Sequence, residues 1–113
     1  MHINFGKSEG VHLVYLKGNL TQGLPCEELK NAVREITHIQ NGQAIIDLTG
    51  IVRIDSAGLG QLVAAYSSLK TRGGELKLVA LPGRVRELLS VTKLDTVIQV
   101  FPTKENAIAS FWL

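Results

Sequence analysis

The chain has 113 residues, a formal net charge of +2, 45% hydrophobic residues and 19% charged residues. Such a chain forms one domain that can bury roughly two-thirds of its unfolded surface. The small charge does not favour a nucleic-acid partner, and no apolar run approaches the ~20 residues of a membrane span. Its one cysteine, Cys26, excludes an internal disulfide and favours a reducing compartment. The sequence therefore predicts a cytoplasmic domain with no membrane or nucleic-acid partner.

In the first half of the chain, β-forming residues predict a hairpin of two strands over residues 2–7 and 11–16. A helix should begin at Pro25, because proline is favoured in a first helical turn. An apolar stripe at helical spacing follows it: Leu29, Ala32, Val33 and Ile36. A third strand is predicted over residues 43–48, with Thr49-Gly50 as the turn that ends it.

A second helix is predicted from Ala57 to Arg72, where Gly73 can supply the left-handed residue that often ends helices. Its apolar positions have helical spacing: Leu59, Leu62, Val63, Tyr66 and Leu69. A fourth strand over residues 75–81 and a short helix from Pro82 should follow. The remaining predicted elements are a fifth strand over residues 96–100 and a last helix capped by Thr103.

These elements give the order ββαβαβαβα. Strands separated by helices are most simply parallel and joined by right-handed crossovers. The sequence thus predicts an α/β fold with a mixed, mostly parallel five-stranded sheet, and with helices packed mainly on one face.

The most informative segment is Ile54-Asp55-Ser56-Ala57-Gly58-Leu59-Gly60, at the junction between a predicted strand and a predicted helix. The first amides of a helix lack internal partners and the helix dipole is positive there, so this end can hold a phosphate. Gly58 and Gly60 would let a partner surface approach Ser56. A second interpretation remains open: Asp and Ser are common helix caps, and glycines also permit tight internal packing.

This segment resembles the signature of the STAS family, and within it that of the bacterial anti-sigma factor antagonists. Their signature is an apolar strand, a short loop and Asp-Ser-(Ser/Thr/Ala)-Gly-(Leu/Ile)-Gly at the start of a helix. The resemblance continues through residues 72–78, 85–89 and 92–94, and it is strong over about residues 43–111. It implies a single STAS domain over residues 1–113, with no catalytic activity and no cofactor.

The resemblance also implies a phosphorylation switch at Ser56. In the family, an anti-sigma factor that is also a serine kinase phosphorylates this serine, and a serine phosphatase resets it. The partner should dock on the start of the second helix and on the loop before the first, and the chain should be a monomer or a weak dimer. The predicted partner-binding residues are Leu20, Thr21, Gly23, Asp55, Ser56, Ala57, Gly58, Gly60 and Gln61.

One departure from the family pattern lies in Gly18-Asn19-Leu20-Thr21, where antagonists usually have Gly-Glu-Leu-Asp. In the family, that aspartate assists recognition or modification of the serine. Thr21 can form hydrogen bonds but brings no charge. It mildly favours a different function, a constitutive STAS scaffold in a stressosome-like or transporter-associated assembly.

Other chemistry finds little support in the sequence. The histidines His2, His12 and His38 have no metal-ligand spacing to one another or to Cys26, and Ser56 is not in a Gly-x-Ser-x-Gly motif. Gly58-Leu59-Gly60 lacks the third glycine of a dinucleotide fingerprint. A nucleotide-binding module remains a third, weakly supported alternative.

Overall fold

The fold follows the predicted order of strands and helices. The computed structural model describes residues 1–112. Its elements are β1 (His2–Ser8), β2 (Val11–Leu20), α1 (Leu24–Thr37), β3 (Gln43–Ile54), α2 (Ser56–Thr71), β4 (Glu75–Val79), α3 (Arg84–Val91), a 3₁₀ turn η1 (Leu94–Thr96), β5 (Val100–Phe101) and α4 (Lys104–Ser110).

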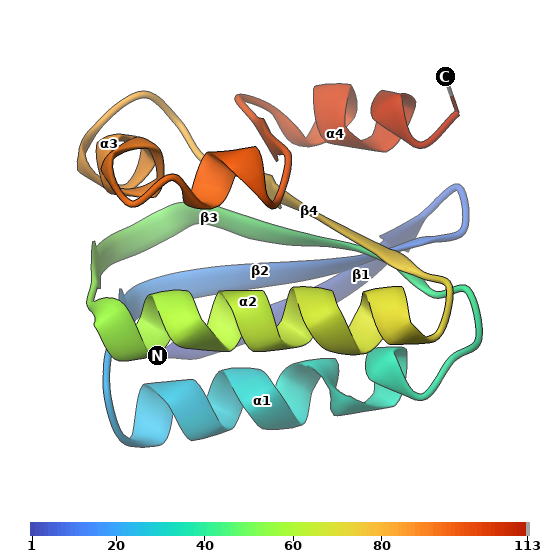
Figure 1. Cartoon of the computed structure of the whole chain (residues 1–113), viewed down its shortest axis with the longest axis horizontal. Coiled ribbons are helices and arrows are strands. Elements are labelled where there is room, and N and C mark those ends of the chain that lie inside the picture. The colour runs from blue at the N-terminus through green and yellow to red at the C-terminus, as the bar shows by residue number, and fades with distance from the viewer. Residues whose placement is uncertain (113) are drawn as a thin grey trace.

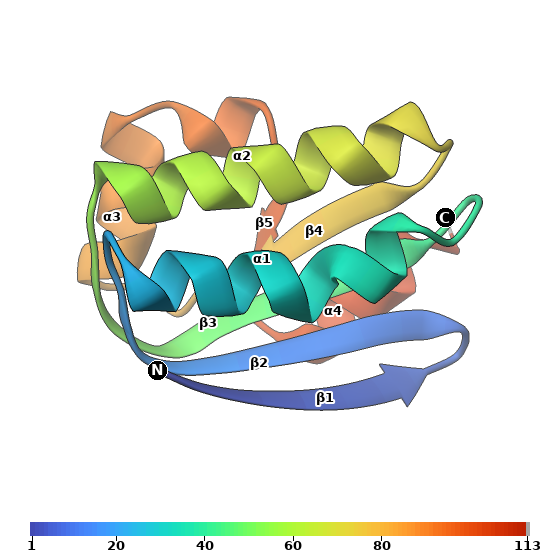
Figure 2. The same ribbon diagram turned by 90° about the horizontal axis from the view of Figure 1, so that it is seen from below.

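The five strands form one sheet in the order β1-β2-β3-β4-β5. Strands β1 and β2 are antiparallel, and each later pair is parallel. The helices α1 and α2 lie side by side across one face of this sheet (Figure 2). Helix α4 lies on the opposite face (Figure 1). The predicted mixed, mostly parallel sheet is confirmed, and so is the prediction that most helices pack on one face.

Each face of the sheet has its own hydrophobic core. The larger core joins the sheet to α1, α2 and α3, and contains Leu29, Leu62 and Leu89. The smaller core lies under α4 and contains Val11, Leu13, Ile45, Val79, Ala107 and Ile108. Because successive strand residues point to opposite faces, Ile45 and Ile46 belong to different cores. Coverage of both faces explains why the central strands are almost continuously apolar.

Two strands run further than the sequence predicts. Strand β2 extends to Leu20 instead of Leu16, and β3 continues to Ile54, so no turn exists at Thr49-Gly50. The two extensions pair with each other, with irregular register after Tyr15. Gly50 fits there because a Cβ atom at this position would lie only 2.6 Å from the carbonyl oxygen of Leu16. Strand pairing thus overrides the turn preference, and β3 leads directly into the motif.

The position predicted for the last strand, residues 96–100, is also wrong. Residues 94–96 form a 3₁₀ turn, and β5 is limited to Val100–Phe101. The amides of Val97 and Ile98 both donate to the carbonyl of Leu94, so they are used in local turns and not in the sheet. Strand β4 ends at Val79 rather than residue 81, and α3 begins at Arg84 rather than Pro82.

Two predicted helix ends are confirmed. Helix α2 ends at Thr71, and Gly73 follows with a left-handed φ of 78°. The amides of Gly73 and Gly74 return to the carbonyls of Lys70 and Leu69. Thr103 caps α4 by accepting a hydrogen bond from the amide of Asn106.

Candidate partner-recognition site at the start of α2

The motif lies at the junction of β3 and α2, where Asp55 separates the last strand residue from the first helical one. Asp55 is extended, with φ −110° and ψ −176°, and its Oδ1 accepts a hydrogen bond of 2.9 Å from the amide of Gly58. The helix cap is therefore Asp55. Ser56 is the first helical residue, and its side chain is exposed.

The second oxygen of Asp55 connects this junction to the loop before α1. Oδ2 accepts a hydrogen bond of 2.9 Å from the amide of Gln22, and the Asp55 amide donates to the carbonyl of Leu20 at 3.4 Å. The hydrogen bonds from the Gln22 and Gly58 amides lower the pKa of Asp55, because they stabilise the ionised carboxylate. One side chain thus holds two chain segments beside Ser56.

Cys26 forms a further hydrogen bond to the same loop. Its buried thiol donates to the carbonyl oxygen of Thr21 at 3.2 Å. Burial raises the pKa of this thiol, and the negative charge of Asp55 raises it further, so the sulfur keeps its proton for this hydrogen bond. Cys26 therefore fits a structural function in positioning Thr21.

The accessible part of the site is formed by small side chains. Ser56 and Gly60 are exposed and one helical turn apart, so they lie on the same side of α2. A Cβ atom at Gly60 would have no atom within 4 Å. Within residues 1–112, the Ser56 hydroxyl forms no side-chain hydrogen bond. The hydroxyl is thus available to a partner or a modifying enzyme.

The structure brings most of the predicted site residues together. The exposed or half-buried members are Thr21, Gly23, Asp55, Ser56, Ala57, Gly60 and Gln61. The hydrogen bond between Asp55 and the Gln22 amide places the loop that contains Thr21 and Gly23 beside the start of α2. The two chain segments expected to form one docking surface are therefore adjacent.

Two predicted docking residues have an internal function instead. The Leu20 side chain is 0% exposed and belongs to the larger core. Gly58 is also buried, and a Cβ atom there would clash with the carbonyl oxygen of Leu20 and lie 2.9 Å from Ile54 Cγ1. The expectation that these two residues face a partner is therefore corrected. Gly58 allows the start of α2 to pack directly on the end of β2.

Leu24 is an exposed apolar residue at the end of the loop expected to dock, residues 20–24. It is the first residue of α1 and 72% exposed, close in sequence to Gln22 and Gly23. A signal was present in the sequence, because Leu24 lies off the apolar stripe predicted for this helix, which is Leu29, Ala32, Val33 and Ile36. An exposed leucine at the end of the loop that Asp55 holds extends the surface that a protein partner could contact.

The described part of the chain offers no alternative centre of metal chemistry. Among residues 1–112, no group of three or more His, Cys, Asp or Glu side chains is placed to hold a metal ion. Within the same residues, no helix has the length and apolar character needed to cross a membrane.

Comparison with known proteins assigns the fold and the motif to one family. The STAS domain model matches residues 2–107, and the chain belongs to this family. It is 37% identical over 67 residues to the anti-sigma-B factor antagonist of Listeria monocytogenes. That match covers 58% of this chain and 59% of the relative, so the chain spans little more than half the length of that relative. The family is regulatory rather than catalytic.

Solved structures with the same fold come from two settings. An anti-sigma factor antagonist from Mycobacterium paratuberculosis has a TM-score of 0.84 and 24% identity, covering 96% of this chain and 92% of that one. A sulfate transporter family protein from Wolinella succinogenes has a TM-score of 0.75 and 21% identity, covering 91% and 85%. At these identities the likeness concerns the fold alone.

The packing of Gly58 and the openness of Gly60 predict opposite effects of alanine. Gly58→Ala should destabilise the domain by about 1–3 kcal/mol, as overpacking of a filled site does. Gly60→Ala should leave stability unchanged or raise it by up to ~1 kcal/mol, because alanine is the better helix former. Thermal melts of both variants measure the difference. Equal stability of the two would contradict the internal function of Gly58.

The depressed pKa of Asp55 predicts how its contribution depends on pH. A carboxylate that is easier to ionise in the folded state stabilises the fold above its unfolded pKa of about 3.9. This contribution is lost as the pH falls below that value and through the lower folded pKa. Asp55→Ala should therefore lower the Tm by several degrees at pH 7, and the difference from wild type should shrink in strong acid.

Asp55→Asn is the matched control, because it keeps one acceptor oxygen and the size of the side chain but cannot ionise. Its Tm at pH 7 should lie between those of wild type and Asp55→Ala. If Asp55→Ala melts like the wild type at pH 7, the carboxylate does not hold the junction together.

Proposed function

We propose that the domain is an anti-sigma factor antagonist of the bacterial cytoplasm, switched by phosphorylation of Ser56. The observation that carries this proposal is that Asp55 and Ser56, although adjacent, have different functions. Asp55 holds the helix start through its hydrogen bonds to Gln22 and Gly58, whereas Ser56 is exposed. A phosphate can be added at Ser56 without removing any contact that holds the junction.

In the unmodified state, the proposed surface consists of the small side chains around Ser56 and the loop before α1. An anti-sigma factor would dock there and release its sigma factor for transcription. The exposed Leu24 adds apolar area beside this surface. The name of the matched Listeria relative, an anti-sigma-B factor antagonist, supports this kind of partner.

In the modified state, charge prevents docking. Phosphorylation adds about −1.5 to −2 charge and three acceptor oxygens. The Asp55 carboxylate lies in the adjacent residue and already accepts two amide hydrogen bonds. The phosphate therefore adds to an existing negative charge, and a surface that fits a small neutral hydroxyl would no longer bind. The kinase would be the anti-sigma factor itself, and a serine phosphatase would restore binding.

Thr21 supports a second candidate, a constitutive scaffold or a regulatory part of a transport system. No carboxylate occupies the position where antagonists usually have aspartate. The occurrence of the same fold in a sulfate transporter family protein is compatible with this function. The two candidates differ in one property, since only the antagonist requires its binding to change with the charge at Ser56.

Kinase specificity is the first test. Ser56 should be the phosphorylated residue of the motif, because Ala57 leaves no second hydroxyl beside it. The domain is incubated with ATP and the anti-sigma factor kinase that it is proposed to bind, and mass spectrometry locates the phosphate. Ser56→Ala is the control and should remain unmodified. Phosphate mainly at Thr49, Ser67 or Ser68 would contradict the assignment.

The charge at position 56 gives the sharper test. Ser56→Ala should fold and bind the anti-sigma factor constitutively. Ser56→Asp should also fold, because the roughly 0.3–1 kcal/mol that a helix start gives an anion offsets repulsion from Asp55. Its affinity should nevertheless fall at least tenfold, which corresponds to about 1.4 kcal/mol. Thermal melts and calorimetric titrations measure both quantities.

Ser56→Asn is the matched control for the size of the aspartate side chain. It should bind more tightly than Ser56→Asp, because it has nearly the same shape without the charge. If Ser56→Asp binds as tightly as the unmodified domain, Ser56 is no charge switch and the scaffold is the better description.

A further inference from the structure

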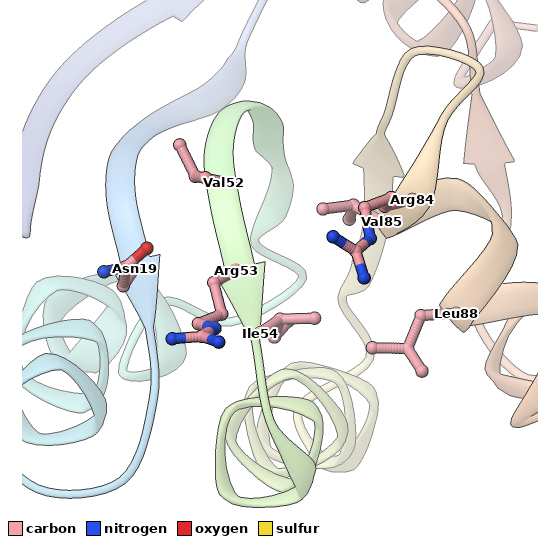
Figure 3. A pocket seen from close by; sticks show the side chains of 7 residues that line it. All are labelled: Asn19, Val52, Arg53, Ile54, Arg84, Val85 and Leu88. Carbon is pink, nitrogen blue, oxygen red and sulfur yellow. The ribbon is translucent and has the colours of Figure 1, made fainter.

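A second polar feature lies at the same edge of the sheet, between the carboxyl ends of β2 and β3 and the start of α3. It is a pocket of about 540 Å³. This volume is in the range of small-molecule sites, which run from about 300 to 1,000 Å³. Its lining includes Asn19, Arg53, Ile54, Arg84, Val85 and Leu88 (Figure 3).

The pocket has two positive charges without compensating carboxylates. Arg84 extends from the start of α3 toward β3, and Arg53 lies on the side of β3 nearer Asn19 (Figure 3). Among residues 1–112, neither guanidinium forms an ion pair or a side-chain hydrogen bond. The nearby Arg86 differs, because its Nη1 lies 3.1 Å from Asp95 Oδ2. The two pocket arginines are thus free to bind an anion.

The start of α3 adds hydrogen-bond donors to these charges. Its cap residue is Gly83, which provides no side-chain hydrogen bond. The first amide bonded back to it is that of Glu87, which donates to the Gly83 carbonyl at 2.9 Å. The amides of residues 84–86 therefore precede the helical hydrogen bonds, and no cap side chain serves them. Together with Arg84 they suit an oxyanion, which the helix dipole also favours.

The remaining lining is apolar. Ile54 on β3 and Leu88 on α3 point toward each other below Arg84, and Val85 lies beside Arg84 above them (Figure 3). A bare inorganic ion would leave the surfaces of these side chains that face the pocket uncovered. A ligand that joins an anionic group to a small apolar group would contact both parts of the pocket.

We propose that this pocket binds a small phosphate monoester with an apolar ester group. The phosphate lies at Arg84 and the first amides of α3, and the ester group lies on Ile54, Val85 and Leu88. Arg53 supplies the second positive charge on the other side of β3. Guanidinium geometry suits phosphate oxygens, and a phosphate offers Arg84 and the amides three acceptor oxygens where a carboxylate offers two. Binding here is independent of phosphorylation at Ser56.

Phenyl phosphate is a suitable probe, followed by amide NMR shifts and calorimetry on the whole chain at constant ionic strength. Saturable shifts should concentrate at residues 53–54 and 84–88. Phenyl phosphate should bind at least tenfold more tightly than inorganic phosphate and more tightly than benzoate. Shifts spread evenly over the basic surface, or equal affinity for phenyl phosphate and inorganic phosphate, would overturn the proposal.

Variants assign the binding to the two arginines. Arg84→Gln should weaken phenyl phosphate binding at least fivefold, and Arg53→Gln should weaken it by less because it removes only a nearby charge, while the Tm of both stays near that of wild type. Arg72→Gln, an exposed arginine at the far end of α2, is the control and should change affinity less than twofold. Unchanged affinity in both pocket variants overturns the proposal. Ser56→Ala should bind phenyl phosphate normally, so this test and that of the Ser56 switch can fail separately.

Discussion

The arrangement of the candidate site depends on the carboxylate of Asp55. One oxygen accepts a hydrogen bond from the amide of Gln22, which lies 33 residues earlier in the chain. The other accepts a hydrogen bond from the amide of Gly58, three residues later. The first bond fixes the loop before α1, and the second begins α2. Because both donors are backbone amides, the geometry depends little on which side chains surround them. The lowered pKa of Asp55 reflects the same two bonds and keeps the group ionised at neutral pH.

Close packing beneath this carboxylate completes the junction. Gly58 sits against the carbonyl of Leu20, and Leu20 itself is part of the larger core. The motif glycines therefore have different functions even though they are only two residues apart. Gly58 allows the helix to approach the sheet, and Gly60 leaves the outer surface of α2 open. The start of the helix is rigidly held on its inner side and unobstructed on its outer side, as a recognition surface requires.

The order of elements, the sheet and the location of the motif could be predicted because they depend on local patterns: apolar periodicity, Gly73 after α2 and Thr103 before α4. The continuation of β3 through Thr49-Gly50 could not be predicted in this way, because pairing with the extended β2 outweighs the turn preference of these residues. Spacing alone also could not separate Gly58 from Gly60, or show that Leu20 faces inward. Such distinctions depend on which atoms of a distant segment lie opposite, and the chain sequence does not contain that information locally.

The two helix starts at this edge of the sheet differ in a way that affects any anion nearby. At α2, the Asp55 carboxylate already accepts the hydrogen bond from the Gly58 amide and neutralises part of the positive end of the dipole. A phosphate on Ser56 would share the helix start with this carboxylate, so part of its charge would face outward toward a partner. At α3, the cap residue Gly83 has no side chain that could accept hydrogen bonds from the first amides, and Arg84 adds a positive charge. Under the two proposals, the same edge would repel a partner at one helix start and attract an anion at the other.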